Sequence, residues 1–267
     1  MKIRLTYLSA AALALTLTAC DEVDEGERFE PVEDFTPRKN VLIEDFTGQR
    51  CNNCPRATNT IASMQQLFGE EHVVAVGIHG GPLSLPAPAG LATTTAAEYI
   101  ARWGVESYPS GIIDRTGGTQ LYTAWTASVL ERLQMEPAVD ISVTPAYDAA
   151  TRSLSISVAT TGRTGAAGQL SVWLVENAIT GYQLMPTGQS NLQYVHNHVF
   201  RTAVNGTWGE DVAVAPGATD TKTYTVALDA AWKAENMAVV AFVSNDQDGV
   251  LQVVQQPLAA DDAETQE

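Results

Sequence analysis

The chain has 267 residues and a mass of 28.5 kDa, which is long for one domain and sufficient for two. Hydrophobic residues make up 45% and charged residues 17%, as in globular proteins rather than fibrous or wholly disordered ones. The net charge of −16 argues against a nucleic-acid-binding protein, because such proteins need a basic surface to displace counterions. Three cysteines are too few for a scaffold stapled by disulfides.

Residues 1–19 have the pattern of a secretory signal peptide. Lys2 and Arg4 form a short basic region, and the apolar or small stretch that follows is shorter than the roughly 20 residues that span a bilayer. Leu17-Thr18-Ala19-Cys20 resembles the cleavage box of bacterial lipoproteins, in which the cysteine becomes the mature N-terminus and carries acyl chains such as palmitate. This resemblance implies that a lipid on Cys20 anchors the protein to a membrane. The alternative is an ordinary cleaved signal.

Acidic segments flank the rest of the chain. Residues 20–38 are expected to form a flexible tether and residues 258–267 an acidic tail, because densely spaced like charges repel each other. Acidic residues directly after the lipidated cysteine also resemble the surface-export signal of some Gram-negative lipoproteins. The sequence does not separate these two roles. Much of the net negative charge lies in these segments and says little about a ligand.

Strand-like and helix-like runs alternate from Val41 to about Met135, as is typical of α/β units. Residues 41–46 and 72–78 are predicted as buried strands, 94–103 as a helix and 110–115 as a short strand. Gly117-Gly118 is expected to form a turn, and Thr123 could cap a last helix. Two sets of apolar residues recur at helical spacing: Ala57, Ile61, Met64 and Phe68, then Trp125, Val129 and Leu133.

After Pro137 the hydrophobic period changes to two. Val139, Ile141 and Val143 alternate with polar residues, and later segments repeat this pattern. About seven strands are predicted, one of them over residues 194–200. Such a set is typical of an immunoglobulin-like β-sandwich, although the Cys…Trp…Cys signature is absent.

Cys51-Asn52-Asn53-Cys54 follows a predicted strand and opens a predicted helix. A helix N-terminus stabilises a thiolate, and the thiolate is the form that attacks disulfides. Cys51 is therefore the candidate nucleophile, with its sulfur exposed, and Cys54 the resolving thiol. The alternatives are a structural disulfide and half of a zinc site, but no second cysteine pair exists to complete the zinc site. No cofactor is expected.

The segment from Gly104 to Ile113 resembles the thioredoxin segment whose cis-proline faces the C-x-x-C pair. This resemblance implies a cis Tyr108–Pro109 bond and a place for Pro109 beside the sulfurs, where a substrate peptide could pair with the backbone. The alternative is a trans proline that begins an edge strand. The sequence departs from thioredoxin at Arg50, which replaces an aromatic residue. Arg50 could lower the Cys51 pKa or simply be solvated.

Nearly the whole mature chain is similar to the outer membrane protein 28 family of lipid-anchored envelope proteins. The similarity rests on residues 41–48 running into Cys51–Pro55, on Ile78–Gly81, on Tyr108-Pro109 and on Tyr194–Arg201. It implies an outer-membrane lipoprotein, on the periplasmic or the cell-surface side. The fold class expected is α/β plus all-β, with a thioredoxin-like domain over 39–136 followed by an immunoglobulin-like β-sandwich over 137–257. The similarity does not settle an activity, because fold does not imply function.

Several other residues are weaker candidates. His79 ends a predicted strand and could tune the Cys51 thiolate, or have no role. His196 and His198 lie two apart on a predicted strand, where an ordinary hydrogen-bonded pair is favoured over a metal site. Residues 246–249 are expected to form a hairpin turn rather than a calcium loop. Three tryptophans are expected to be core or strand aromatics rather than a sugar platform: Trp173, Trp208 and Trp232.

Two functions follow as hypotheses. The first is a lipid-anchored envelope protein that exchanges thiols and disulfides through Cys51 and Cys54. The second is a surface binding or adhesion lipoprotein in which the cysteine pair is only a structural disulfide. Both leave the protein partner in the envelope or outside the cell unidentified.

Overall fold

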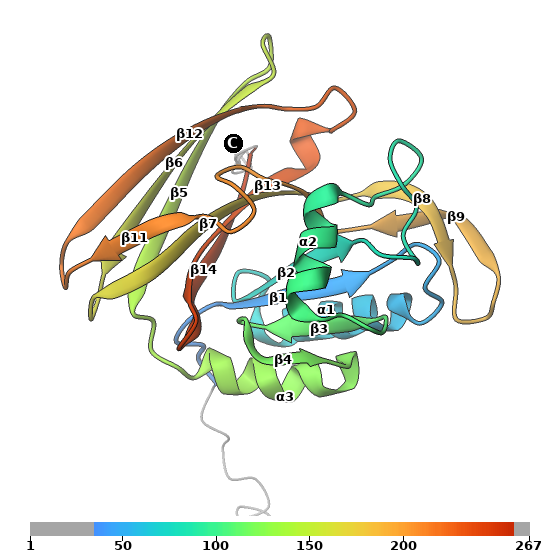
Figure 1. Ribbon diagram of the computed structural model, residues 1–267, viewed down its shortest axis with the longest axis horizontal. Coiled ribbons are helices and arrows are strands. Elements are labelled where there is room, and N and C mark those ends of the chain that lie inside the picture. Colours follow the sequence, from blue (N-terminus) through green and yellow to red (C-terminus); the bar gives the residue numbers. More distant parts are fainter. Residues whose placement is uncertain (1–34, 259–267) are drawn as a thin grey trace, which may run out of the picture. The chain divides into compact units, whose positions relative to one another are not determined.

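Strands dominate residues 35–258, the part of the chain that the computed structural model describes. This part contains fourteen strands, three α-helices and a short 3-10 turn over Ala234–Asn236 (Figure 1). The predicted signal peptide, Cys20, most of the predicted tether and nearly all of the predicted acidic tail lie outside the described residues. Within those residues, no helix combines the length and apolar character needed to cross a membrane.

One sheet of nine strands runs through both halves of the sequence. Strands β1 and β2 pair in parallel, β10 pairs in parallel with β2 at Val199 and Gly77, and the other neighbours are antiparallel. The spatial order is β14 (Gly249–Pro257), β13 (Met237–Asn245), β7 (Ala166–Glu176), β10 (Val199–Ala203), β2 (Val73–His79), β1 (Val41–Thr47), β3 (Ser110–Ile113) and β4 (Thr116–Gln120), with β11 (Glu210–Val214) beside β7.

Three helices cover the β1–β4 part of this sheet. One face packs against α1 (Cys54–Phe68) and α3 (Tyr122–Leu133), and the other face packs against α2 (Thr94–Trp103). Alternation along β1 explains this arrangement, because Val41 and Ile43 join the core under α1 and α3 while Leu42 joins the core under α2. Gly104 ends α2 in the left-handed conformation that favours glycine.

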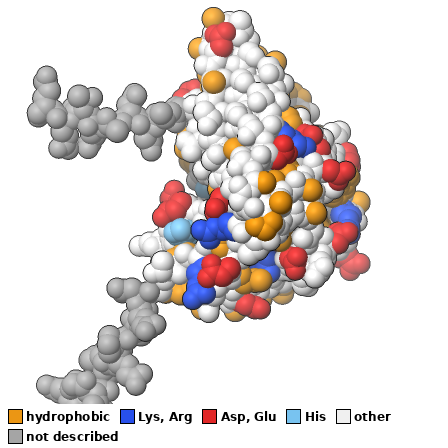
Figure 2. Space-filling view, turned by 90° about the vertical axis from the view of Figure 1, so that its left-hand side faces the viewer, with side chains coloured by type: hydrophobic (Ala, Val, Ile, Leu, Met, Phe, Trp, Pro, Cys, Tyr) orange, Lys and Arg blue, Asp and Glu red, His pale blue; other side chains and the backbone are white. Residues whose placement is uncertain are grey.

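A second sheet covers the other end of the large one. It contains β12 (Thr219–Ala227), β6 (Ser153–Gly162) and β5 (Val139–Asp148), whose apolar residues pack on those of β7 and β13. The outward positions of these strands are Ser- and Thr-rich. In the space-filling view of this end, the upper part of the face is largely uncharged, and acidic and basic side chains lie mainly in its middle and lower parts (Figure 2). A separate hairpin is formed by β8 (Ile179–Leu184) and β9 (Ser190–His196).

The predicted fold class is wrong. We expected a thioredoxin-like α/β domain followed by an immunoglobulin-like sandwich, but the described chain is mostly β, and its large sheet takes strands from both sides of Pro137. The cause is the pairing of β10 with β2, which joins β7, β13 and β14 to β1 and β3. Hydrophobic periodicity identifies strands but does not tell which strands share a sheet.

Individual elements agree better with the sequence. The helix predicted over 94–103 is α2, and Trp125, Val129 and Leu133 are buried as predicted. Thr123 does not cap α3, whose N-cap is Leu121 without a side-chain hydrogen bond. The single strand predicted over 194–200 is divided between β9 and β10, which belong to different sheets.

Candidate functional site

The cysteine pair lies where β1 leads into α1. Cys51 and Cys54 form a disulfide, and Cys54 is the first residue of the helix. The Cys54 backbone N–H donates to Cys51 Sγ at 3.1 Å. Pro55 suits the first turn of the helix, where its missing N–H would have had no partner within the helix. The predicted strand, C-x-x-C turn and helix therefore occur in that order.

Both cysteines are buried, which contradicts the expectation of an exposed Cys51. Cys51 and Cys54 are each 2% exposed. The β8–β9 hairpin is bonded to this turn: Gln183 Nε2 donates to the Cys51 carbonyl at 2.8 Å, and the Leu184 N–H donates to the Gln49 carbonyl at 2.8 Å. A partner disulfide can reach the sulfurs only if this cover moves.

Asp45 is a buried carboxyl group beside Cys54. It is 4% exposed, and its Oδ1 has no hydrogen-bond partner among the described residues. Burial raises the pKa of Asp45 to about 8, since desolvation disfavours the carboxylate. Asp45 and Cys54 line the same cavity of about 30 Å³, which is enough for a water molecule.

Asp45 also lines a larger cavity of about 390 Å³, together with Glu70, Asn177 and His198. It therefore stands between the surroundings of Cys54 and a wider space. A carboxyl group with a pKa of about 8 is mostly protonated at pH 7, and only its ionised minority can accept a proton and pass it on.

His79 and His196 complete the small cavity. Their rings are 5.6 Å apart between centroids, and His196 hydrogen-bonds the Tyr182 carbonyl at 3.2 Å. Burial lowers the pKa of His79 to about 3, and burial also lowers the pKa of His196. Both rings are thus neutral near pH 7 and supply no positive charge for a thiolate.

The sequence predicted that His196 and His198 lie on the same strand, but they do not. The strand β9 ends at His196, and His198 has a φ of 57°, just before β10 begins. Burial lowers the pKa of His198 to about 4. Among the described residues, no group of three or more His, Cys, Asp or Glu side chains is arranged to hold a metal ion.

The remaining candidates from the sequence lie around the same end of β1. The Tyr108–Pro109 bond is cis, as the resemblance implied. Ser110 pairs with Phe46 in the antiparallel β1–β3 pair, so Pro109 lies beside the C-terminal end of β1. Pro109 is buried and Tyr108 is partly buried. Arg50 is exposed, and its backbone N–H donates to the Leu83 carbonyl.

Sequence reasoning missed Asp45 and Gln183. The signal for Asp45 was present, because Glu44 and Asp45 are two acids inside an otherwise apolar strand, and buried acids need a partner or a purpose. Glu44 has its partner in Arg115 at 2.6 Å, whereas Asp45 Oδ1 has no partner in the described part of the chain. Nothing in the sequence around Gln183 indicates that it reaches the cysteine turn.

Comparison with known proteins places the fold and the family. HBP35 of Porphyromonas gingivalis is similar at 15% identity and a TM-score of 0.64, over 87% of this chain and 80% of that chain, which supports the fold alone. A domain of the outer membrane lipoprotein Omp28 from the same organism is 25% identical, with a TM-score of 0.34, over 46% of this chain and 88% of that chain. Its TM-score is too low to support a structural argument. Comparison with curated proteins gave no match.

The family model for the outer membrane protein Omp28 matches residues 96–262. The match begins within α2, so it does not include Cys51 and Cys54 and carries no information about them. It spans more than half of the chain. The chain therefore belongs to the Omp28 family, an outer membrane protein family, and this membership places it in the outer membrane.

Proposed function

We propose that this outer membrane protein exchanges thiols and disulfides through Cys51 and Cys54. The observation that carries the proposal is Asp45, a buried carboxyl group without a partner for Oδ1 that shares a cavity with Cys54. Burying such a group lowers the stability of the fold, and perturbed carboxyl groups gather at functional sites. A purely structural disulfide does not need a proton acceptor beside one of its sulfurs.

The reduced protein would act in two steps. The Cys51 thiolate attacks one sulfur of a substrate disulfide, so that a mixed disulfide forms and the other substrate sulfur leaves as a thiolate. In the minority of molecules in which Asp45 is ionised at pH 7, its carboxylate then takes the proton from the Cys54 thiol. The Cys54 thiolate attacks Cys51 Sγ, forms the intramolecular disulfide and releases the second substrate thiolate. Two electrons pass from the cysteine pair to the substrate, and the proton leaves Asp45 for water.

The first step needs access to Cys51. The β8–β9 hairpin covers the pair but buries few side chains of its own, with Gln183 and His196 as its buried residues. An element with few buried contacts opens at low free energy. The proposal therefore includes displacement of this hairpin before a substrate disulfide can react.

The test is reduction of a protein disulfide, such as that of insulin, by the pre-reduced protein. We expect Cys51→Ser to abolish the reaction and Cys54→Ser to accumulate the mixed disulfide. Asp45→Asn should form the mixed disulfide at the normal rate but resolve it at least about tenfold more slowly. If the wild-type protein reduces the substrate no faster than the doubly substituted Cys51→Ser, Cys54→Ser protein, the proposal is wrong.

A structural disulfide in a binding protein is the second candidate, and the 2% exposure of each cysteine favours it. Closing so short a loop stabilises the folded state by about 2 kcal/mol in the chain-entropy model. In that case, reduction would lower the melting temperature and the reduced protein would show no exchange activity.

The lipid anchor is a separate part of the proposal. The lipoprotein-like box ending at Cys20 supports acylation of that cysteine. Two or more acyl chains on it would attach the protein stably to the membrane. Mass spectrometry of the mature N-terminus tests this directly, and Cys20→Ala should move the protein from the membrane fraction to the soluble fraction. An unacylated, membrane-bound protein would contradict it. The substrate is expected to be another envelope or extracellular protein.

A further inference from the structure

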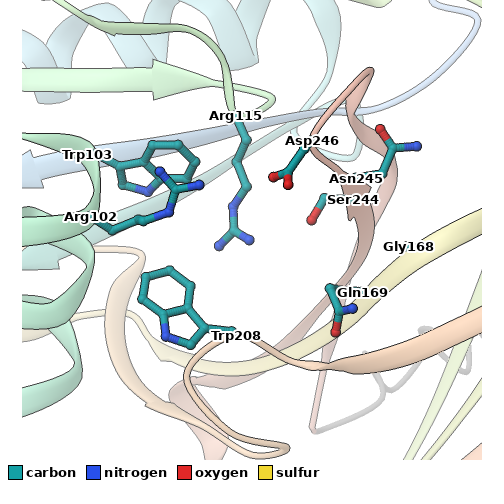
Figure 3. A pocket seen from close by; sticks show the side chains of 9 residues that line it. All are labelled: Arg102, Trp103, Arg115, Gly168, Gln169, Trp208, Ser244, Asn245 and Asp246. Atoms are coloured by element: carbon teal, nitrogen blue, oxygen red, sulfur yellow. The ribbon is translucent and has the colours of Figure 1, made fainter.

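A cavity of about 640 Å³ lies between the end of α2, the β3–β4 turn and the β13–β14 turn (Figure 3). None of its lining residues belongs to the cysteine turn or to the β8–β9 hairpin. Its volume falls within the roughly 300–1,000 Å³ of typical ligand sites. Binding of a ligand in this cavity would be independent of thiol–disulfide exchange.

Arg115 projects into the middle of this cavity (Figure 3). Its side chain is only 9% exposed, and its Nε donates to Glu44 Oε1 at 2.6 Å. Its Nη2 is buried and has no acceptor among the described residues. The Phe242 ring lies 4.6 Å from the guanidinium carbon but offers no oxygen acceptor. An unmatched donor on a buried charged group is costly, so an anion in the cavity is expected to draw the guanidinium towards it and to supply an oxygen acceptor.

A second guanidinium faces the same space. Arg102 lies over the Trp103 ring, 4.9 Å from its centroid, and is exposed at the rim. Among the described residues it forms no salt bridge. Two arginines without a full set of acceptors favour a carboxylate, since planar guanidinium groups match its two oxygens.

Trp208 provides a flat apolar wall. It is 41% exposed and lies in a turn, so the prediction that it is a core or strand aromatic is wrong, whereas Trp173 is fully buried. The Tyr99 ring meets the Trp208 ring edge-on at 5.3 Å between centroids and helps to fix it beside the cavity. An exposed, fixed indole suits the flat C–H face of a sugar ring or another planar group.

The opposite wall is polar and contains an acid. Ser244 comes from β13, Asp246 from the β13–β14 turn and Gln169 from β7. Asn245 points away from the cavity (Figure 3), because its amide is hydrogen-bonded to Gln247 and Asp248 within the turn. Amides donate and accept hydrogen bonds, and a carboxylate accepts them, so this wall suits hydroxyl groups. Asp246 would repel a carboxylate at this wall, so the acidic group of a ligand is expected on the arginine side of the cavity.

We propose that this cavity binds an acidic sugar residue. The sugar carboxylate lies against Arg115 and Arg102, the ring packs on Trp208, and the hydroxyl groups bond to Ser244 and Asp246. A neutral sugar leaves the Arg115 donor unmatched, and a plain aromatic acid leaves the polar wall without partners. The combination of carboxylate, flat ring and hydroxyls satisfies all three walls.

The experiment is titration of the protein with digalacturonic acid, followed by tryptophan fluorescence and calorimetry. Galactobiose serves as the neutral sugar and N-acetylphenylalanine as the acid without hydroxyls. We expect Arg102→Gln and Trp208→Ala each to weaken digalacturonic acid binding about tenfold or more. Arg56→Gln, an exposed change on α1, is the control and should leave binding unchanged.

Arg115→Gln should weaken binding most, but it leaves Glu44 buried without its cation and so could unfold the protein. Arg115→Lys is therefore tested beside it, and the melting temperature of each variant checks folding. Arg115→Lys should keep the fold and still lose about tenfold in affinity, because it cannot reproduce the planar contact. Absence of digalacturonic acid binding to the wild type would overturn the proposal. Equally tight binding of galactobiose or of N-acetylphenylalanine would overturn the acidic or the sugar part respectively.

Discussion

At the scale of single residues, Asp45 is the side chain with the clearest effect on stability. The folded protein retains the Asp45 proton up to about pH 8, whereas the unfolded chain releases it near the ordinary value of 3.8. Folding therefore takes up a proton between these values, and the free energy of unfolding falls as the pH rises through this window. Asp45→Asn removes this loss and should stabilise the oxidised protein by on the order of 4 kcal/mol at pH 7.

The measurement is urea unfolding of both proteins at pH 4, 5.5 and 7. The difference between them isolates Asp45, because the buried histidines act in the opposite direction below about pH 6.5 in both proteins. Asp220→Asn, which changes a carboxyl group outside the core on β12, is the matched control. A difference that does not grow with pH would show that Asp45 titrates normally.

The sequence was informative about residues only where a local pattern carried the chemistry. Cys51 and Cys54 were identified from their spacing, and their disulfide is present. The burial of Cys51 was not predicted, because its cover comes from Gln183, far away along the chain. Asp45 was overlooked because the run of apolar residues around it indicated only a buried strand.

At the scale of elements, the β8–β9 hairpin controls access to the cysteine turn. Gln183 Nε2 donates to the carbonyls of Cys51 and Leu184, at 2.8 and 3.0 Å. Gln183→Ala removes these bonds and should lower the free energy needed to open the hairpin by about 1 to 1.5 kcal/mol. The rate at which dithiothreitol reduces the disulfide should then rise by about tenfold.

The matched control is Gln193→Ala, an exposed glutamine on β9 of the same hairpin. It should leave the rate of reduction unchanged, as followed by alkylation of the freed thiols and mass spectrometry. Equal rates for the wild type and Gln183→Ala would mean that the hairpin does not limit access.

The β3–β4 turn shows why the positions of turns were harder to predict than the elements. Gly117-Gly118 has ordinary turn chemistry, but the two-residue turn is Asp114-Arg115, and the glycines lie in β4. Asp114 and Arg115 have φ values of 48° and 57°, which are unusual for residues other than glycine. Their buried ion pairs hold them there, and those partners are distant in sequence.

At the scale of the whole molecule, the large sheet makes the two halves of the sequence interdependent. The core under α2 combines Leu42 and Val74 from the first half with Trp173, Phe200 and Phe242 from the second. Periodicity separated the helical region from the β region, but both regions contribute to one core. The long-range pairing of β10 with β2 produces this result, and no local pattern in either strand specifies it.

A buried ion cluster around Asp114 fastens β14 to the first half of the chain. Asp114 Oδ2 accepts from Lys39 Nζ at 2.6 Å and from Arg132 Nε at 2.8 Å, and both cations also donate to the Val250 carbonyl. Asp114 Oδ1 accepts from the Leu42 N–H at 2.8 Å. Asp114 is fully buried, and the Lys39 side chain is 2% exposed.

Asp114→Asn should therefore destabilise the protein strongly, by roughly 3–5 kcal/mol, because it leaves a buried ammonium without its anion. Chemical unfolding at pH 7 measures this loss of stability. The control is Asp140→Asn, because Asp140 pairs with Arg163 at the surface, where the free energy of unfolding is expected to fall by less than about 1 kcal/mol. Since the cluster joins both halves, the variant should unfold in one transition at a lower midpoint. Two separate transitions, or a loss no larger than that of the control, would show that the cluster does not couple the halves.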